Sequence, residues 1–227
     1  MSHFNVAVFS RNEDQVDELL APYNEVVEAG SPYAAFKENE DAEPDETTGK
    51  KGYWYNPDAR WDWYCVGGRW RDQLKLLPGR TGKRGPRDNL DKEHQPSPDR
   101  CDIARVRDCD FSPNEKAYCM ALRAWEIAVE GSPMTEAEKK NYMPMYKSEY
   151  YLQQYGTREH YAKLMSDFST YAFITADGEW HETGRMGWWG LDDATKESRD
   201  AYKEAFDEYL QTAKEQDLFI TIVDCHI

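Results

Sequence analysis

The stretch FITIVDCHI, residues 219–227, closes the chain with the composition of a buried β-strand. Its first five residues are apolar or β-branched, which favours a strand over residues 218–227. The opening stretch HFNVAVF, residues 3–9, is of the same kind. Side chains of a strand alternate between two faces, so His3 and Asn5 share one face of this segment. The sequence therefore predicts a strand at each end of the chain, and the two can belong to one sheet.

Patterns between these strands predict five helices and a second pair of strands. The predicted helices cover residues 12–20, 114–129, 135–155 (interrupted at Pro144), 157–168 and 195–213, and the predicted strands cover residues 171–175 and 179–182. This order predicts an α+β fold: a mainly antiparallel sheet, helices packed on one face of it, and a ferredoxin-like core that carries a large insertion. We expect a single α+β domain over residues 1–227, with a loop or insertion at about 21–60 and a basic loop at about 78–98.

The composition indicates a folded, acidic protein. The chain has 227 residues, of which 43 are acidic and 28 are basic, and its formal net charge is −15. Its mean hydropathy of −0.91 is low enough for disorder, but 8 Trp, 15 Tyr and 8 Phe are too many for a disordered chain. Tyr and Trp can each bury roughly 150–250 Å² of surface, so we expect a core built largely from aromatic side chains.

The same composition disfavours several classes of protein. An acidic surface repels the phosphate backbone, so a nucleic-acid polymer is not expected as a partner. No apolar run approaches the roughly 18 residues of a membrane helix, and the N-terminus lacks a signal-peptide pattern, so no membrane partner is expected. Five cysteines without a CxxC pair fit reduced thiols in a cytoplasm. The lack of P-loop, GxGxxG, GxSxG and zinc-spaced motifs disfavours NTPases, dinucleotide dehydrogenases, α/β-hydrolases and zinc fingers.

Four polar residues of the terminal strands form the first candidate site. Alternation places His3 and Asn5 on one face of the first strand, and Asp224 and His226 on one face of the last, so the four converge if both strands lie in one sheet. We interpret His3, Asp224 and His226 as candidate catalytic residues, because two imidazoles can divide acid and base roles at a phosphodiester. The same groups suit a metal ion, although neither a metal nor a cofactor is predicted. The alternative is that both histidines are simply frayed terminal residues.

The second candidate site lies in residues 53–77, where two strands are predicted around a Gly67-Gly68 hairpin turn. Aromatic rings stack on a nucleobase, arginine grips phosphate, and glycine lets the backbone approach a ligand closely. The alternative is that tryptophan supplies the core of a chain poor in Leu and Ile. The candidate ligand-binding residues are Trp61, Trp63, Tyr64, Gly67, Gly68, Arg69 and Trp70, joined by Trp188 and Trp189 from the stretch GRMGWWG.

The surroundings of this second site are basic in an acidic chain. Residues 60–87 contain eight Lys or Arg and two Asp, a local charge of +6. The global charge is therefore compatible with a small anionic ligand, although not with a polymer. The loop from Arg80 to Arg87 can hold such a ligand or pair with the protein's own acidic groups, and solvent exposure is the interpretation we favour.

The segments SHFNVAVF, WDWYCVGGRW, CDIARVRDCDF, DGEWHETGRMGWWG and FITIVDCHI extend over most of the chain. They resemble a family of uncharacterised phage and prophage proteins that share motifs of the forms DWYxxGGRW, GxMGWWG and VDxHI. The resemblance implies a phage accessory protein in the cytoplasm of a bacterial host. Small acidic phage proteins often counter host defence, some by sequestering or cleaving nucleotide immune signals, and this analogy is one of context.

The sequence leaves three functions open. The leading one is binding of a small nucleotide-derived anion such as a cyclic nucleotide, with the aromatic and arginine side chains as a pocket and His3, Asp224 and His226 along one wall. The first alternative is a metal-independent phosphodiesterase that cleaves such a signal with His3 and His226 as base and acid. The second is an acidic interaction module that mimics DNA and blocks a basic host protein. Self-association into a homo-oligomer is left open.

Overall fold

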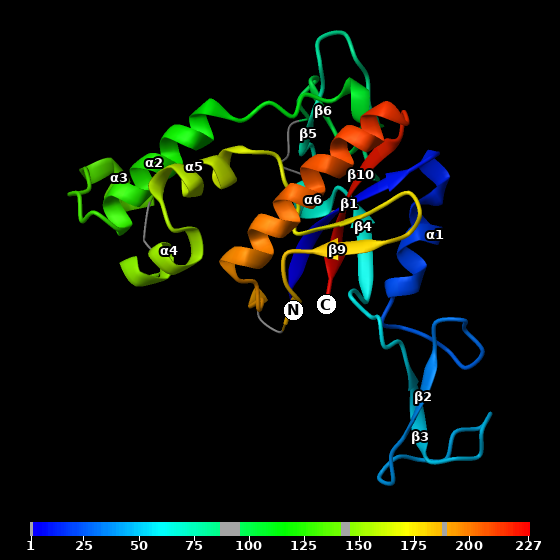
Figure 1. Cartoon of the computed structure of the whole chain (residues 1–227). Helices are drawn as coiled ribbons and strands as arrows, with labels where there is room; N and C mark the ends of the chain where they lie inside the picture. Colours follow the sequence, from blue (N-terminus) through cyan, green and yellow to red (C-terminus); the bar gives the residue numbers. More distant parts are fainter. Residues whose placement is uncertain (1, 87–95, 142–145, 188–189) are drawn as a thin grey trace.

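The computed structural model describes residues 2–86, 96–141, 146–187 and 190–227. Its centre is a six-stranded sheet in which the two terminal strands, β1 (His3–Ser10) and β10 (Phe219–His226), lie side by side (Figure 1). The strand order is β4-β10-β1-β8-β9, and β7 also pairs with β10. The other strands are β4 (Trp63–Val66), β7 (Ile103–Arg105), β8 (Ala172–Ile174) and β9 (Trp180–Glu182). Of these pairings β1–β8 is parallel and the rest are antiparallel, so the α+β class and the mainly antiparallel sheet are confirmed.

The strand order differs from the ferredoxin-like core that the sequence predicted. A ferredoxin-like fold contains a split βαβ unit, in which another strand separates the two parallel strands. Here the parallel strands β1 and β8 are direct neighbours, with Val6 opposite Ala172, and β9 lies at the edge of the sheet. Burial explains this strand order. The apolar residues of β8 and nearly all of β1 are buried in the middle of the sheet, whereas the residues of β9 are half-buried and tolerate an edge position.

One face of the sheet is covered by α1 (Val16–Leu20), where residues 12–20 predicted a helix. The chain enters it through the 3₁₀ turn η1 (Glu13–Gln15), and the side chain of Asn12 accepts a hydrogen bond from the Asp14 amide. Such a cap satisfies amide groups that the start of a helix leaves without partners. The apolar side chains of α1 then pack against β1 and β8 in one hydrophobic core.

The opposite face is covered by α6 (Lys196–Glu215), so helices flank both faces of the sheet and not one face as predicted. The hydroxyl of Thr195 caps this helix by accepting a hydrogen bond from the Ser198 amide. Phe206 of α6 is fully buried and lies against Phe9 of β1, in a second hydrophobic core. Both faces of β1 carry apolar side chains, and each face therefore needs its own cover.

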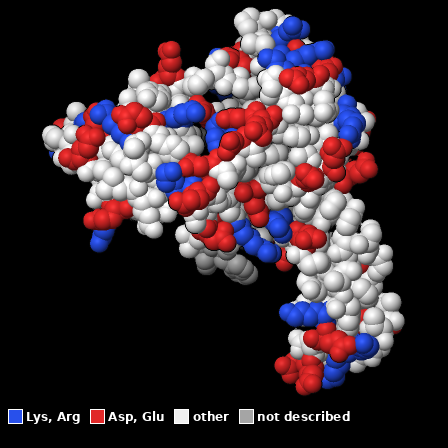
Figure 2. Space-filling view, viewed as in Figure 1, with Lys and Arg blue, Asp and Glu red and all other residues white. Residues whose placement is uncertain are grey.

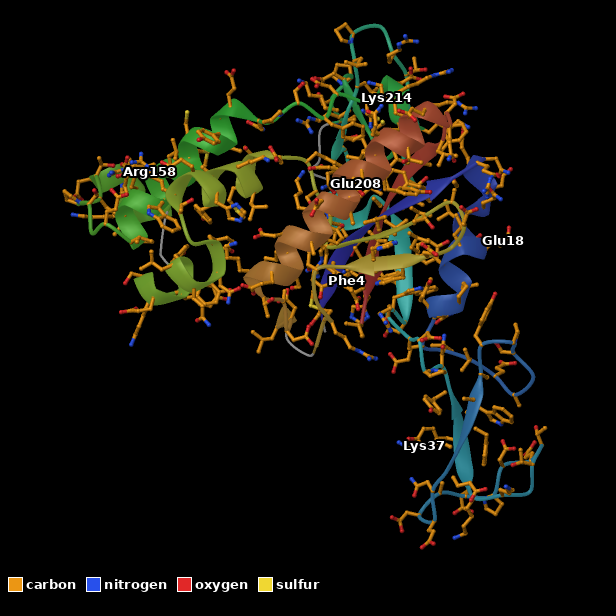
Figure 3. The ribbon with its side chains drawn as sticks, viewed as in Figure 1. Phe4, Glu18, Lys37, Arg158, Glu208 and Lys214 are labelled. Atoms are coloured by element: carbon orange, nitrogen blue, oxygen red, sulfur yellow. The ribbon has the colours of Figure 1, made fainter. Side chains whose placement is uncertain are left out.

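The first insertion is an arm of two antiparallel strands, β2 (Ala35–Glu38) and β3 (Gly52–Tyr55), which follows the 3₁₀ turn η2 (Ala21–Tyr23). The arm projects from the end of the sheet, with Lys37 on it well away from Phe4 in the sheet (Figure 3). It occupies the insertion that was predicted at about 21–60, and its two strands flank the stretch 38–52, which lacks periodicity in the sequence.

The second insertion is a group of helices to one side of the sheet (Figure 1). These helices are α2 (Glu115–Ala128), α3 (Glu136–Asn141), α4 (Ser148–Tyr155) and α5 (Arg158–Ser166). The helix predicted over 135–155 is divided into α3 and α4, and Pro144 lies outside the described residues. Trp125 of α2 packs against Tyr151 and Tyr161 in an aromatic cluster, as the composition led us to expect.

Gly67 and Gly68 do not form the predicted hairpin. β4 pairs with β10, and the chain turns at the two glycines into the 3₁₀ turn η3 (Gly68–Trp70). Their φ angles are +79° and +51°, and an added Cβ would lie 2.6 Å from Oδ2 of Asp102 and 2.4 Å from Cβ of Asp224, respectively. Glycine is therefore required here for a close approach to two buried carboxylates. The remaining short elements are β5 (Leu74–Lys75), β6 (Arg100–Cys101) and the 3₁₀ turn η5 (Val106–Asp108).

Candidate active site at the open end of the sheet

The pairing of β1 with β10 brings the polar residues of the terminal strands onto one face of the sheet. His3 is opposite His226 and Asn5 is opposite Asp224, and directly opposed residues of an antiparallel pair share a face. The two imidazole rings meet edge to face, with their centroids 4.9 Å apart. The two terminal strands therefore lie in one sheet, and their polar residues converge as predicted.

Each imidazole is held by a carboxylate. Nδ1 of His3 lies 2.8 Å from Oδ1 of Asp224, and Nδ1 of His226 lies 2.6 Å from Oδ1 of Asp62. An ionised carboxylate can only accept hydrogen bonds, so Nδ1 of each ring is the donor. Nε2 of each neutral ring then carries the lone pair, which is the arrangement that orients a histidine for acid–base chemistry.

Asp62 is a site residue that the sequence patterns do not indicate. It directly precedes β4, and its amide donates a hydrogen bond to the carbonyl oxygen of His226 at 3.0 Å. This contact exists because β4 pairs with β10, with Trp63 opposite His226, and not with a hairpin partner across Gly67-Gly68. The signal in the sequence, an aspartate before an aromatic strand, is too common to identify a catalytic group.

The two carboxylates differ in their surroundings. The side chain of Asp224 is 3% exposed, and its Oδ2 accepts a hydrogen bond from the Arg69 amide at 2.9 Å. The side chain of Asp62 is 35% exposed. The histidine side chains themselves are alike, at 16% exposed for His3 and 15% for His226. Both rings therefore keep part of their surface open to solvent, while the Asp224 carboxylate is buried.

Asn5 lies deeper on the same face and has structural partners. Its Nδ2 donates to Oε1 of Gln73 at 3.0 Å, and its Oδ1 accepts from the amide of Tyr171 at 2.8 Å. These two bonds occupy its polar groups on both sides. Asn5 therefore links β1 to the neighbouring chain segments and leaves the histidine pair as the reactive part of this face.

Two members of the predicted aromatic pocket belong to the core on the α1 face. Trp61 is 6% exposed, and its Nε1 donates to the carbonyl oxygen of Leu20. The ring of Tyr64 packs edge-on against Trp61, and its hydroxyl donates to Asp17. Burial, together with that carboxylate, raises the pKa of Tyr64. The structure therefore does not bring these two rings into one pocket with the histidines, and the alternative of a tryptophan-built core holds for Trp61.

Trp63 does join the histidine pair. It is 49% exposed, stands opposite His226 in the sheet, and its ring centroid lies 6.4 Å from that of His3. Trp70, in contrast, packs against the core on the α6 face. Trp188 and Trp189 lie outside the described residues. Of the predicted aromatic residues that the structure describes, Trp63 therefore offers an exposed ring beside the histidines.

The basic side chains of residues 60–87 are mostly paired within the protein. Figure 2 shows acidic and basic side chains intermixed over one face of the molecule. The ion pairs are Arg60–Glu182, Lys75–Asp110, Arg80–Asp108, Lys83–Glu13 and Arg84–Asp72. Arg71 donates to backbone carbonyl oxygens, and residues 87–95 of the predicted basic loop lie outside the described part of the chain. Arg69 is exposed, and no ion pair joins it to a described residue.

One cavity of the protein lies away from the histidines. It has a volume of about 740 Å³ and lies among α2, α3 and α5, with Met120, Ile127 and Met165 in its lining. Across residues 2–86, 96–141, 146–187 and 190–227, no cluster of three or more His, Cys, Asp or Glu side chains is suited to a metal ion. In the same residues no helix combines the length and apolar character needed to cross a membrane.

Comparisons with known proteins place no further constraint on this site. The chain matches no family model, no curated protein and no solved structure. The resemblance of its motifs to phage proteins therefore stays a prediction. Functional inference rests on the geometry of the histidine pair and its carboxylates.

Proposed function

We propose that the chain is an acid–base phosphodiesterase that hydrolyses a small cyclic nucleotide, with His3 and His226 as catalytic residues. The observation that carries this proposal is the pair of imidazoles, each bound to a carboxylate through Nδ1 and 4.9 Å apart at their centroids. Hydrolysis of a phosphodiester needs one group to take a proton from the attacking water and another to give one to the leaving oxygen. Imidazole is the side chain whose charge changes near neutral pH, so a pair of them supplies both groups.

The separation of the rings suits a single phosphate group. A hydrogen bond from Nε2 spans about 3 Å, so two rings 4.9 Å apart at their centroids can contact oxygens of the same phosphate. Arg69 is exposed and its amide is bonded to Asp224, so it is the basic residue of this region that we propose for a bidentate contact to the phosphate. Trp63 offers an exposed face on which a nucleobase can stack.

Charge favours a small substrate over a polymer. The net charge of −15 repels an extended phosphate backbone, whereas a single nucleotide meets only its immediate surroundings. In the phage setting that the motifs imply, a host cyclic-nucleotide signal is the substrate that we propose. The binding protein predicted first from the sequence becomes the alternative, because the aromatic pocket on which it depended is divided between two faces of the sheet.

The test is incubation with a panel of cyclic mononucleotides and cyclic dinucleotides, followed by chromatography before and after protease digestion. We expect new phosphomonoester products before digestion. His3→Asn and His226→Asn should each lower the rate by about 100-fold or more, which is the contribution typical of a general acid or base. Asparagine keeps a group near the position of Nδ1 and removes Nε2, so these variants separate chemistry from packing.

His160→Asn is the matched control. His160 is also paired with an aspartate, since its Nε2 lies 2.9 Å from Oδ1 of Asp200, but it is on α5, away from the sheet. Its loss should leave the rate unchanged. If the nucleotide stays intact and is released only by digestion, the chain is a binding protein and the proposed activity is wrong. Equal rates for wild type and His3→Asn would reject the histidine mechanism.

A further inference from the structure

The two carboxylates of the site are not equivalent, although the two histidines are equally exposed. The side chain of Asp224 is 3% exposed and that of Asp62 is 35% exposed. Asp62 is tied to β10 through its amide, but its carboxylate is open to water on one side. A charge–charge interaction is weakened by water, so the Asp224 carboxylate acts on its histidine with the stronger field.

Asp224 is also fixed in place by the turn that follows β4. The Arg69 amide donates to its Oδ2 at 2.9 Å, so Oδ1 is left to face His3. Gly68 lies against the same side chain, and a Cβ there would be 2.4 Å from Cβ of Asp224. The backbone of residues 68–69 therefore holds the carboxylate in one orientation, and Gly68 is a positioning residue for it.

Two imidazolium rings at this distance repel each other. When two titrating groups interact strongly, the first proton is shared by the pair and is held mainly at the better-stabilised position. Among the described residues, His3 has side-chain hydrogen-bond or ring contacts with Asp224, His226 and Trp63, and His226 has such contacts with Asp62 and His3. The carboxylates therefore distinguish the two rings: His3 has a buried and fixed partner, whereas His226 has a partner that is open to water.

We infer that the two histidines have fixed and different roles: His3, backed by Asp224, is the general acid, and His226, backed by Asp62, is the general base. This inference rests on the proposed function. Nε2 of His226 takes a proton from water as the water oxygen bonds to phosphorus. Nε2–H of His3 gives its proton to the departing alkoxide as the P–O ester bond breaks. One water is consumed, one phosphomonoester and one alcohol group form, and proton exchange with solvent restores both rings.

Leaving-group dependence tests this assignment. Two esters of thymidine 5′-monophosphate serve as probes: the methyl ester, whose leaving oxygen needs a proton, and the p-nitrophenyl ester, whose leaving oxygen does not. His3→Asn should lose about 100-fold or more on the methyl ester, the usual contribution of a general acid, and most of that loss should disappear on the p-nitrophenyl ester. His226→Asn should lose as much on both esters, because both reactions need an activated water.

Asp224→Asn and Asp62→Asn extend the test. We expect the Asp224 variant to follow the leaving-group pattern of His3→Asn, and the Asp62 variant to follow that of His226→Asn. Two results would overturn the role assignment but not the proposed phosphodiesterase activity. One is that His226→Asn regains activity on the p-nitrophenyl ester, and the other is that both histidine variants lose equally on both esters. If the wild-type protein cleaves neither ester and no cyclic nucleotide, the proposed function fails and the assignment fails with it.

Discussion

The same face of the same two strands has two different ends. At one end, Phe9 of β1 lies beneath Phe206 of α6, and both are fully buried. At the other end of the same face, His3 and His226 keep 16% and 15% of their side chains exposed. The strands change from core to candidate site within a few residues because α6 covers only one end (Figure 1). Apolar side chains at the covered end stabilise the pairing that holds the histidines together at the open end.

The covered end should dominate stability. Phe206→Ala removes a fully buried ring that contacts Phe9 and Phe173. We expect a loss of about 3–5 kcal/mol in the free energy of unfolding, as is usual for a buried aromatic side chain replaced by alanine. Denaturant unfolding followed by circular dichroism measures it. His226→Asn at the open end is the control. Its expected loss is about 1 kcal/mol or less, because asparagine keeps a group near the position of Nδ1, and equal losses at the two ends would contradict the comparison.

The two tryptophans around Asp62 give a second contrast, because Trp61 faces the core under α1 and Trp63 faces the open end. Trp63→Ala should weaken nucleotide binding by about 1–3 kcal/mol, the usual value of base stacking on an aromatic ring. Its free energy of unfolding should change by about 0.5 kcal/mol or less, as for an exposed position. Calorimetric titration and denaturant unfolding measure the two quantities.

Trp61→Ala is the matched variant for this contrast. Trp61 is 6% exposed and its indole is hydrogen-bonded to Leu20, so its loss should appear in the free energy of unfolding. A Trp61 variant that stays stable but loses nucleotide binding would place the ligand on the α1 face. That result would restore the aromatic pocket that the sequence first suggested.

A third measurement tests how tightly the open end is built. Gly68→Ala places a Cβ 2.4 Å from Cβ of Asp224, whereas Gly79→Ala meets nothing within 4 Å, and both glycines have positive φ. Both variants carry the cost of an alanine at positive φ. The difference between their free energies of unfolding therefore reports the steric crowding at Gly68. We expect Gly68→Ala to be about 1–3 kcal/mol less stable than Gly79→Ala, the usual penalty of overpacking. Equal stabilities would show that Asp224 is free to move, and the fixed orientation of His3 would be lost with it.

The smallest expected effect is a pH dependence at the covered end. Tyr202 of α6 is buried, its hydroxyl lies 3.1 Å from that of Thr170, and burial raises its pKa above the usual value. The unfolded chain ionises this tyrosine from about pH 10, while the folded chain keeps it neutral. Its contribution to stability is therefore complete below about pH 10 and is lost as the pH rises toward the higher folded pKa.

Tyr202→Phe isolates this contribution, because the other tyrosines are common to both proteins. At neutral pH we expect the variant to be about 1 kcal/mol less stable, for one lost hydrogen bond. Above about pH 10 the gap should narrow, because the wild type alone must keep this hydroxyl neutral. Denaturant unfolding at pH 7 and pH 11 measures the gap, and a gap that widens at pH 11 would contradict the burial of this hydroxyl.

Local patterns in the sequence predicted the elements well. The capping side chains of Asn12 and Thr195 and the apolar spacing of the helices depend on residues a few positions apart, so α1 and α6 lie where they were expected. The same is true of His3 and Asp224, because alternation along a strand assigns each side chain to a face before any partner is known. Once β1 and β10 are paired, the histidine pair follows from that rule alone.

The partners of each strand were decided only by the tertiary structure. A strand's backbone groups can bond to any other strand, so the choice among β4, β8 and β9 depends on which arrangement buries the most apolar surface. That choice set β8 beside β1 in place of a ferredoxin-like order, and it turned Gly67-Gly68 from a hairpin into a support for Asp224. It also brought Asp62 to His226. The sequence by itself determined which residues can share a face, and packing over the whole sheet determined which of them meet.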